Sequence, residues 1–295
     1  MKSLLDIPVD ELILMANDQR RKYKLALDLC SIMNAKSGVC PEDCKFCSQS
    51  SHYKTDIERY PLKTKEEIVK RGEYAKEIGA ERFGIVISGR KPNKKELDVI
   101  TDAISELKEK ISVCASLGRL DKDEFMHLKD AGLSRYHHNI ETSERYFRNV
   151  VSTYTFYEKI KTLEVAKNLG FETCSGGIIG MGETWKDRLD MANLLKSLGV
   201  DSVPINILIP IKDTPFENML PISPIDAIRT IAIFRIILKN KTIRLAGGRE
   251  SLGPFEATAF FAGANAMIIG EYLTVKGRPV EDDYKLIEEI KRLWA

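Results

Sequence analysis

The sequence has no long uncharged hydrophobic run, and it lacks the signatures of several protein classes. No stretch is apolar enough to cross a bilayer, so no membrane association is expected. The N-terminal segment carries Asp6, Asp10 and Glu11 among its apolar residues, which is not the pattern of a secretory signal peptide. No long block of one charge sign occurs, and 45 basic against 43 acidic residues leave a formal net charge of +2. We therefore expect a small-molecule substrate and no nucleic-acid partner.

Linkers and low-complexity tracts are also missing from the 295 residues. A content of 43% hydrophobic and 30% charged residues excludes disorder and is enough for a large core. We therefore expect a single domain over residues 1–295. In the absence of a secretory signal, the six cysteines are expected to be metal ligands or catalytic thiols of a cytoplasmic protein rather than a disulfide framework.

Short apolar segments alternate with helix-like segments along the whole chain. The expected strands are Ala26–Asn34, Arg82–Ser88, Ser112–Ser116, Ser134–Asn139, Glu172–Ile178, Ser202–Ile209, Thr242–Ala246 and Ala266–Ile269. The expected helices are Val9–Lys24, Lys65–Ile78, Lys94–Lys108, Asp121–Ala131, Phe156–Asn168, Trp185–Leu198, Pro224–Leu238 and Asp282–Trp294. This repetition predicts an α/β fold, a single (β/α)8 barrel of the TIM type with an N-terminal helix; a doubly wound open sheet is the alternative.

The sharpest motif is C-x3-C-x2-C, formed by Cys40, Cys44 and Cys47 in a loop over residues 36–54, after the first expected strand. Three thiolates can hold three irons of a 4Fe-4S cluster and leave the fourth iron open for S-adenosylmethionine (SAM). In a (β/α)8 barrel, chemistry takes place at the carboxyl ends of the strands, where this loop begins. A zinc site is the alternative, but zinc usually takes two ligand pairs, and His52 is the only nearby fourth ligand.

The other cysteines, Cys30, Cys114 and Cys174, lie in expected strands one, three and five. Alternate strands of such a barrel contribute to one interior layer, so the three thiols are expected to meet if all point inward. Arg244 lies in strand seven, where a buried arginine needs a charge partner such as an anionic iron–sulfur cluster. The pattern favours a second cluster over three separately buried thiols.

Polar residues on the even strands are expected to line a substrate cavity. Asn206 lies in an apolar strand, where its amide must bond the backbone, buried water or, as we favour, a ligand amide or urea. His137 and His138 are interpreted as structural, because adjacent strand residues face opposite sides and cannot easily share a metal ion. The glycine-rich run after Cys174 contains Ile178 and is either a tight turn or, as we favour, a wall for SAM. Phe46 is either loop packing or an aromatic wall near the SAM adenine.

Taken together, these segments resemble the biotin synthase family over nearly the full length of the chain. The matching segments are CPEDCKFCSQSSHYKT, RYHHNIETS, CSGGIIGMGET, VPINILIPIKDTP, IRTIAIFRII, RLAGGRE and GANAMIIGEYLT. The resemblance implies a (β/α)8 fold, SAM as cofactor, a SAM-cleaving 4Fe-4S cluster, a sulfide-donating auxiliary cluster, and sulfur insertion into dethiobiotin to give biotin. It also implies a one-electron reductant such as flavodoxin or ferredoxin, and it is compatible with a homodimer.

Carried over by position, the resemblance assigns roles to individual residues. Cys40, Cys44 and Cys47 correspond to the SAM-cluster ligands. Phe46, Asn139, Glu141, Lys159 and Ile178 correspond to SAM contacts, with Asn139 and Glu141 at the ribose and Lys159 in place of an Arg at the carboxylate. The substrate contacts would be Asn139, Asn206 and Thr274.

One departure concerns the auxiliary cluster. Better-known members of the family hold a 2Fe-2S cluster with three cysteines and an arginine, and here Gly84 occupies one of the cysteine positions. The chain resembles a divergent branch with Ile-Val-x-Ser-Gly-Arg, in which the cluster would be bound by Cys30, Cys114 and Cys174. Arg244 would then be either a ligand or a charge partner. The alternatives are a radical SAM enzyme with another substrate, through another sulfur insertion or a carbon rearrangement, and a non-catalytic iron–sulfur carrier.

Overall fold

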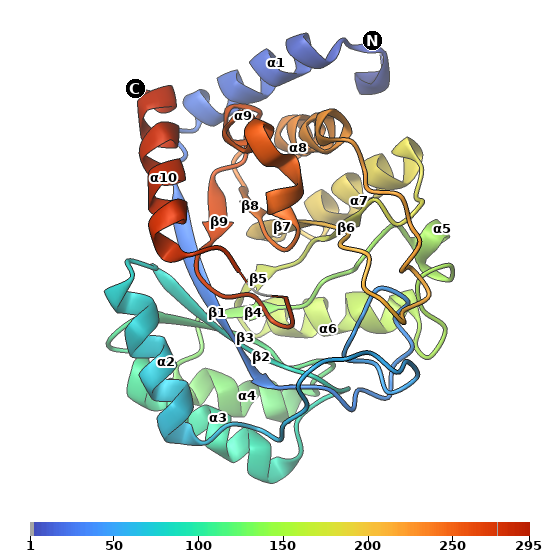
Figure 1. Ribbon diagram of the computed structural model, residues 1–295. Coiled ribbons are helices and arrows are strands. Elements are labelled where there is room, and N and C mark those ends of the chain that lie inside the picture. The colour runs from blue at the N-terminus through green and yellow to red at the C-terminus, as the bar shows by residue number, and fades with distance from the viewer. Residues whose placement is uncertain (1–2, 276) are drawn as a thin grey trace.

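Side-chain caps determine where most of the helices begin. Helices α2, α3, α4, α6 and α7 each start with a capping box, in which the N-cap side chain and the side chain three residues later each accept a backbone N–H. At α7 the pair is Thr184 and Asp187. The computed structural model describes residues 3–275 and 277–295 (Figure 1). Its helices are η1 (Leu4–Asp6), α1 (Val9–Lys22), α2 (Lys65–Glu77), α3 (Lys94–Leu107), α4 (Lys122–Ala131), α5 (Glu144–Phe147), α6 (Phe156–Asn168), α7 (Trp185–Ser197), α8 (Pro224–Leu238), η2 (Arg249–Phe255), α9 (Glu256–Phe261) and α10 (Val280–Trp294).

The strands form one closed parallel sheet surrounded by helices. They are β1 (Asp28–Lys36), β2 (Arg82–Ile87), β3 (Ser112–Ser116), β4 (Arg135–His137), β5 (Glu172–Cys174), β6 (Gly177–Ile179), β7 (Ser202–Ile207), β8 (Thr242–Leu245) and β9 (Ala266–Ile268). Their order is β5-β4-β3-β2-β1-β9-β8-β7-β6, and a pairing of β5 with β7 closes the ring. Because β5 and β6 are two halves of one barrel strand, the eight-stranded (β/α)8 barrel predicted from the sequence is confirmed.

The prediction of one continuous fifth strand over Glu172–Ile178 was wrong in one respect, because residues 175–176 do not belong to a strand. At Gly176 the backbone approaches β7 so closely that an added Cβ would lie 1.9 Å from the carbonyl oxygen of Pro204. The side chain of Asn139 takes the place of a strand partner here, since its Oδ1 accepts the Gly176 N–H at 3.0 Å. The first half pairs with β4 and the second half with β7, so the barrel changes partners at this glycine.

The fourth expected strand, Ser134–Asn139, is also shorter in the structure. Strand β4 ends at His137, and the chain then turns through Glu141, whose φ of 69° lies in the left-handed region. The short helices α5, η2 and α9 were not expected, because none is long enough to show a helical hydrophobic period. Smaller differences affect the ends of other elements: α1 stops two residues before Lys24, and α10 begins two residues before Asp282.

The N-terminal helix α1 lies outside the barrel beside α8 and α9, with α10 next to it (Figure 1). The guanidinium of Arg20 on α1 stacks over the Trp294 ring of α10, 4.2 Å from its centroid. Helix α8 is buried on most of its sides, which explains why its sequence is apolar almost throughout. Across residues 3–275 and 277–295, we find no helix that has both the length and the apolar character needed to span a membrane.

Candidate active site

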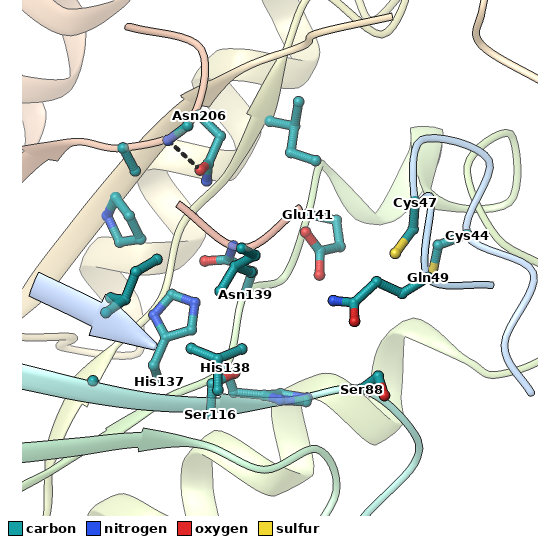
Figure 2. Close-up of a pocket in the computed structure, with 18 of the residues that line it drawn as sticks. Cys44, Cys47, Gln49, Ser88, Ser116, His137, His138, Asn139, Glu141 and Asn206 are labelled. Carbon is teal, nitrogen blue, oxygen red and sulfur yellow. Dashed lines mark hydrogen bonds between the residues drawn. The ribbon is translucent and has the colours of Figure 1, made fainter. Parts of the chain in front are cut away.

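The barrel encloses a cavity of about 440 Å³ that reaches the loop carrying the C-x3-C-x2-C motif. Every site residue predicted from the sequence lines this cavity: Cys30, Cys40, Cys44, Phe46, Cys47, Cys114, Asn139, Glu141, Lys159, Cys174, Ile178, Asn206, Arg244 and Thr274. In Figure 2, Cys44 and Cys47 lie on one side of the cavity and Asn206 on the other, with Glu141 and Asn139 between them. The cavity therefore connects the motif loop with the polar residues of the even strands.

Backbone hydrogen bonds hold the motif loop in a compact fold. The N–H of Cys47 donates to the carbonyl of Cys44 at 2.9 Å, and the N–H of Cys40 donates to the carbonyl of Gln49 at 3.0 Å. Asp43 fastens the loop to the segment before α6, because its Oδ1 accepts the backbone N–H of Ser152 at 2.9 Å. The three thiols are therefore held by the loop itself rather than by a regular strand or helix.

The motif thiols suit an iron–sulfur cluster better than a single metal ion. Burial raises the pKa of the Cys44 thiol, and it raises the pKa of Cys47 to about 11. Metal binding would have to remove these protons. Within the described parts of the chain, no three His, Cys, Asp or Glu side chains converge closely enough to share one ion. A 4Fe-4S cluster also binds thiolates, but it does not require the side chains to converge on one ion, because each thiolate binds a different iron.

Glu141 and Lys159 form a buried ion pair beside the motif loop. The Lys159 Nζ donates to Glu141 Oε1 at 3.0 Å, and each residue is less than a tenth exposed. The ammonium also lies 5.1 Å from the centroid of the Tyr154 ring, whose hydroxyl is 3.2 Å from the Cys44 sulfur. The left-handed backbone at Glu141 is costly for a residue with a side chain, by about 1–3 kcal/mol. Here it turns the carboxylate into the cavity (Figure 2).

The polar residues deeper in the cavity are already bonded to the backbone. Asn206 donates from Nδ2 to the Gly177 carbonyl at 3.2 Å, and its Oδ1 accepts the Gly247 N–H at 3.0 Å (Figure 2). An amide can form up to four hydrogen bonds, so part of the Asn206 amide remains available to a ligand. Asn139 uses its oxygen on Gly176, and no described residue accepts a hydrogen bond from its NH2 group. Thr274 Oγ1 accepts a hydrogen bond from Ser48 of the motif loop at 3.0 Å.

Cys30, Cys114 and Cys174 are all buried, and their side chains face the same cavity, as expected from strands one, three and five. Burial raises the pKa of Cys30, and it raises the pKa of Cys114 to about 12. At Cys174 burial has the same tendency, but His137, together with Arg135 and Arg244, outweighs it and holds the thiol pKa at about 7. One of the three thiols is thus prepared to lose its proton.

Sequence reasoning missed the partner of Arg244, which is Asp28. The guanidinium Nη2 is 2.5 Å from Asp28 Oδ1, and Nη1 donates to the Met267 carbonyl at 3.0 Å. Two further arginines, Arg82 and Arg135, pair with Glu172 at 3.2 and 2.8 Å. The signal was present in the sequence, because Asp28 precedes Cys30 by two residues and therefore faces the same side of the strand.

These ionic groups determine what the thiol layer can hold. Three guanidiniums, those of Arg82, Arg135 and Arg244, face two carboxylates, those of Asp28 and Glu172. Glu81 is a further carboxylate close to Arg82 and Arg244. Arg135 and Arg244 line the cavity together with the three thiols. This environment fits an anionic iron–sulfur cluster, because buried charges require compensation.

Gly84 also lines the cavity, beside Cys114 in the register of β2 and β3. A Cβ added at Gly84 would lie 3.1 Å from Cγ2 of Ile32, which is tighter than an ordinary contact. The side chain of Ile32, two residues after Cys30 on β1, therefore fills the space next to Gly84. Strand β1 provides both the thiol and the apolar side chain that restricts the position across from it.

His137 and His138 both contribute to the lining of the cavity, but their rings have different neighbours, as expected for adjacent residues of a strand. His138 stacks on Tyr136 with ring centroids 6.4 Å apart, and burial holds its pKa well below the ordinary value. His137 instead lies beside Cys174, its neighbour in the register of β4 and β5.

Comparisons with known proteins agree with this arrangement. Two family models match the chain, the Radical SAM superfamily over residues 35–195 and the Biotin and Thiamin Synthesis associated domain over residues 204–291. The chain is 54% identical to the biotin synthase of Thermotoga petrophila, over 99% of this chain and 98% of that protein. It is 57% identical to the biotin synthase of Thermotoga neapolitana, over 90% and 97%. The structure of methylornithine synthase (PylB) has a TM-score of 0.81 and covers 99% of this chain and 89% of that one; at 19% identity this is a likeness of fold.

Proposed function

The chain belongs to the biotin synthase family, whose reaction is the radical SAM insertion of sulfur into dethiobiotin, and we propose that it performs this reaction with the residues lining the cavity. It is a radical SAM sulfurtransferase, and its cofactors are SAM, a SAM-cleaving 4Fe-4S cluster and an auxiliary iron–sulfur cluster. The observation that carries the residue assignment is that the motif thiols, the polar residues and the three strand thiols all line one cavity.

Cys40, Cys44 and Cys47 are the proposed ligands of the 4Fe-4S cluster. When bound, this cluster and SAM supply a 5′-deoxyadenosyl radical that takes hydrogen from dethiobiotin, and the auxiliary cluster supplies the sulfur. Because the motif loop is fastened through Asp43, its thiols keep their positions relative to the barrel. Such positioning is the protein's main contribution to a radical reaction, together with the exclusion of water.

The SAM contacts proposed are Phe46, Asn139, Glu141, Lys159 and Ile178. Support comes from the buried pair of Glu141 and Lys159, which offers a carboxylate to hydroxyl groups and an ammonium to a carboxylate. Ile178 is tied to the same place, since its backbone N–H donates to the Glu141 carbonyl at 2.8 Å. Phe46 and Ile178 supply apolar surface suited to an adenine ring.

Asn139, Asn206 and Thr274 are the proposed contacts to dethiobiotin. A ureido group has both donors and acceptors, which matches the unused hydrogen-bonding capacity of the two amides. Their existing bonds to Gly176, Gly177 and Gly247 fix the amide planes in advance. A preorganised partner is favourable because binding then costs little side-chain entropy.

Cys30, Cys114 and Cys174 are the proposed ligands of the auxiliary cluster, with Arg244 as a charge partner. Cys30→Ser should lower the iron and sulfide content, leave SAM cleavage intact and yield little biotin. Ser31→Ala is the matched control, because its side chain lies next along the same strand and is not among the residues that line the cavity. Full biotin formation with unchanged iron in Cys30→Ser would show that Cys30 is only a buried thiol.

The experiment that tests the whole proposal is anaerobic reconstitution with iron and sulfide, followed by incubation with reductant, SAM and dethiobiotin. Mass spectrometry should then detect 5′-deoxyadenosine and biotin. Iron uptake without SAM cleavage would indicate a carrier of clusters, and SAM cleavage without biotin would indicate a different substrate. Either result would contradict the proposal.

The reaction needs an electron donor, and we propose a flavodoxin or a ferredoxin, because both transfer single electrons as the reaction requires. We also propose a cytoplasmic location. Its support is that all six cysteines are free thiols, a state that reducing compartments maintain and that cluster assembly requires.

A further inference from the structure

The fourth position of the auxiliary cluster can be assigned from the arrangement of strands around the thiol layer. Cys114 lies on β3 and Cys174 on β5, and β4 runs between these two strands. The residues of β4 that line the cavity are Arg135 and His137. Arg135 is opposite Cys114 in the register, and His137 is opposite Cys174. A group on β4 thus stands between two of the three proposed ligands.

Arg244 is poorly placed to be that group. Its Nη2 is bound to the Asp28 carboxylate at 2.5 Å, and its Nη1 donates to the Met267 carbonyl at 3.0 Å. A guanidinium has no lone pair for a metal unless it loses a proton, and pairing with a carboxylate opposes that loss. Arg135 is committed in the same way to Glu172.

His137, in contrast to the two arginines, forms no ion pair with a carboxylate of any described residue. Apart from its contact with the Cys174 thiol, its ring makes no hydrogen bond to any described residue. The ring of His52, by contrast, is 3.1 Å from the Pro41 carbonyl. Neutral imidazole carries a lone pair and is a familiar iron ligand in Rieske centres.

We propose that His137 is the fourth ligand of the auxiliary cluster, completing a set with Cys30, Cys114 and Cys174. The inference rests on the proposed function, because it takes the three strand thiols as ligands. It leaves Arg244 as the cation that neutralises charge next to the cluster. An imidazole in place of a thiolate makes the cluster less negative, so its reduction potential is higher than that of a cluster with four thiolates.

The test uses a chain that holds only the auxiliary cluster, the variant Cys40→Ala, Cys44→Ala, Cys47→Ala. This protein is produced with 15N-labelled histidine, reconstituted anaerobically with iron and sulfide, cryoreduced and examined by pulsed EPR. The expected result is a histidine nitrogen coupling as large as that of a Rieske centre. His137→Gln should remove the coupling, whereas His138→Gln, the neighbouring control, should retain it.

A further variant covers the case in which His137→Gln binds no cluster. His137→Cys should retain iron and sulfide, lose the nitrogen coupling and shift the reduction potential to a lower value. The inference is overturned if the labelled protein shows no coupling, shows only the weak coupling of a hydrogen-bonded ring, or retains its coupling in His137→Gln. Failure to take up any second cluster would contradict the proposed function itself, which iron and sulfide counts reveal before spectroscopy begins.

Discussion

Replacing Asp28 by asparagine should destabilise the metal-free protein more than any neighbouring exposed substitution. The change keeps the shape of the side chain but leaves the Arg244 guanidinium, which is 3% exposed, without its carboxylate at 2.5 Å. Removing one member of a buried ion pair typically costs about 3–5 kcal/mol. The Asp28 side chain is 18% exposed and the Met267 carbonyl still accepts from Arg244, so we expect the lower end, about 3 kcal/mol.

Equilibrium urea unfolding of the metal-free protein measures this loss. Trp185 and Trp294 report on α7 and α10 by fluorescence, and far-UV circular dichroism reports on the whole barrel. Coincident transitions from both probes would justify a two-state treatment. The double variant Asp28→Asn, Arg244→Met removes the orphaned charge and should recover most of the loss. A single-variant loss under about 1 kcal/mol, or a double variant no better than the single one, would refute the reasoning.

Replacing any one of Cys40, Cys44 or Cys47 by alanine should abolish 5′-deoxyadenosine formation, as measured by liquid chromatography, because two thiolates should not retain the cluster; normal SAM cleavage in all three variants would sink that assignment. Asn206→Ala should weaken dethiobiotin binding by about 1–3 kcal/mol, and an unchanged dissociation constant would remove this residue from the site. Burial of Asp187 favours its neutral form, but hydroxyl and guanidinium partners outweigh burial and lower its pKa. Its stabilising effect is thus present above the ordinary pKa and lost as pH falls through the lowered value. Asp187→Asn should reduce the unfolding free energy at pH 7 and have little effect in strong acid; an equal loss at both pH values would contradict this.

The features of this protein that were predictable from sequence are those with a local pattern. Alternating apolar segments predicted the barrel, and the position of Cys40, Cys44 and Cys47 after the first strand placed the motif loop at the cavity. Cys30, Cys114 and Cys174 were expected to meet in one interior layer, if all pointed inward, because they lie on alternate strands. The positions of residues on β4 and β5 were harder to predict from the sequence, because β4 ends at His137 and the fifth strand is interrupted after Cys174.

What the sequence could not predict depends on contacts between distant strands. Lys159 meets Glu141 because α6 lies next to the turn after β4, and no spacing rule links two residues on different elements. Arg244 meets Asp28 because β9 pairs with both of their strands, β8 and β1. The stagger of the closed barrel determines the second pair, and the stagger is a property of the whole ring rather than of any segment.

The fifth strand is interrupted at Gly176, so we expect the hydrogen bonds of the barrel to open more easily here than in its continuous strands. The Gly176 carbonyl accepts backbone N–H groups, but its own N–H donates to a side chain, Asn139, so we expect this amide hydrogen to be held less firmly than in a continuous strand. If the NH2 group of Asn139 donates a hydrogen bond to a ligand, the side chain becomes fixed. The hydrogen bond from Gly176 to Asn139 then opens less often. Substrate occupancy should therefore slow hydrogen exchange at Gly176 and Gly177 while exchange in β2 and β3 stays the same. Hydrogen exchange at these two glycines would therefore indicate whether the cavity is occupied.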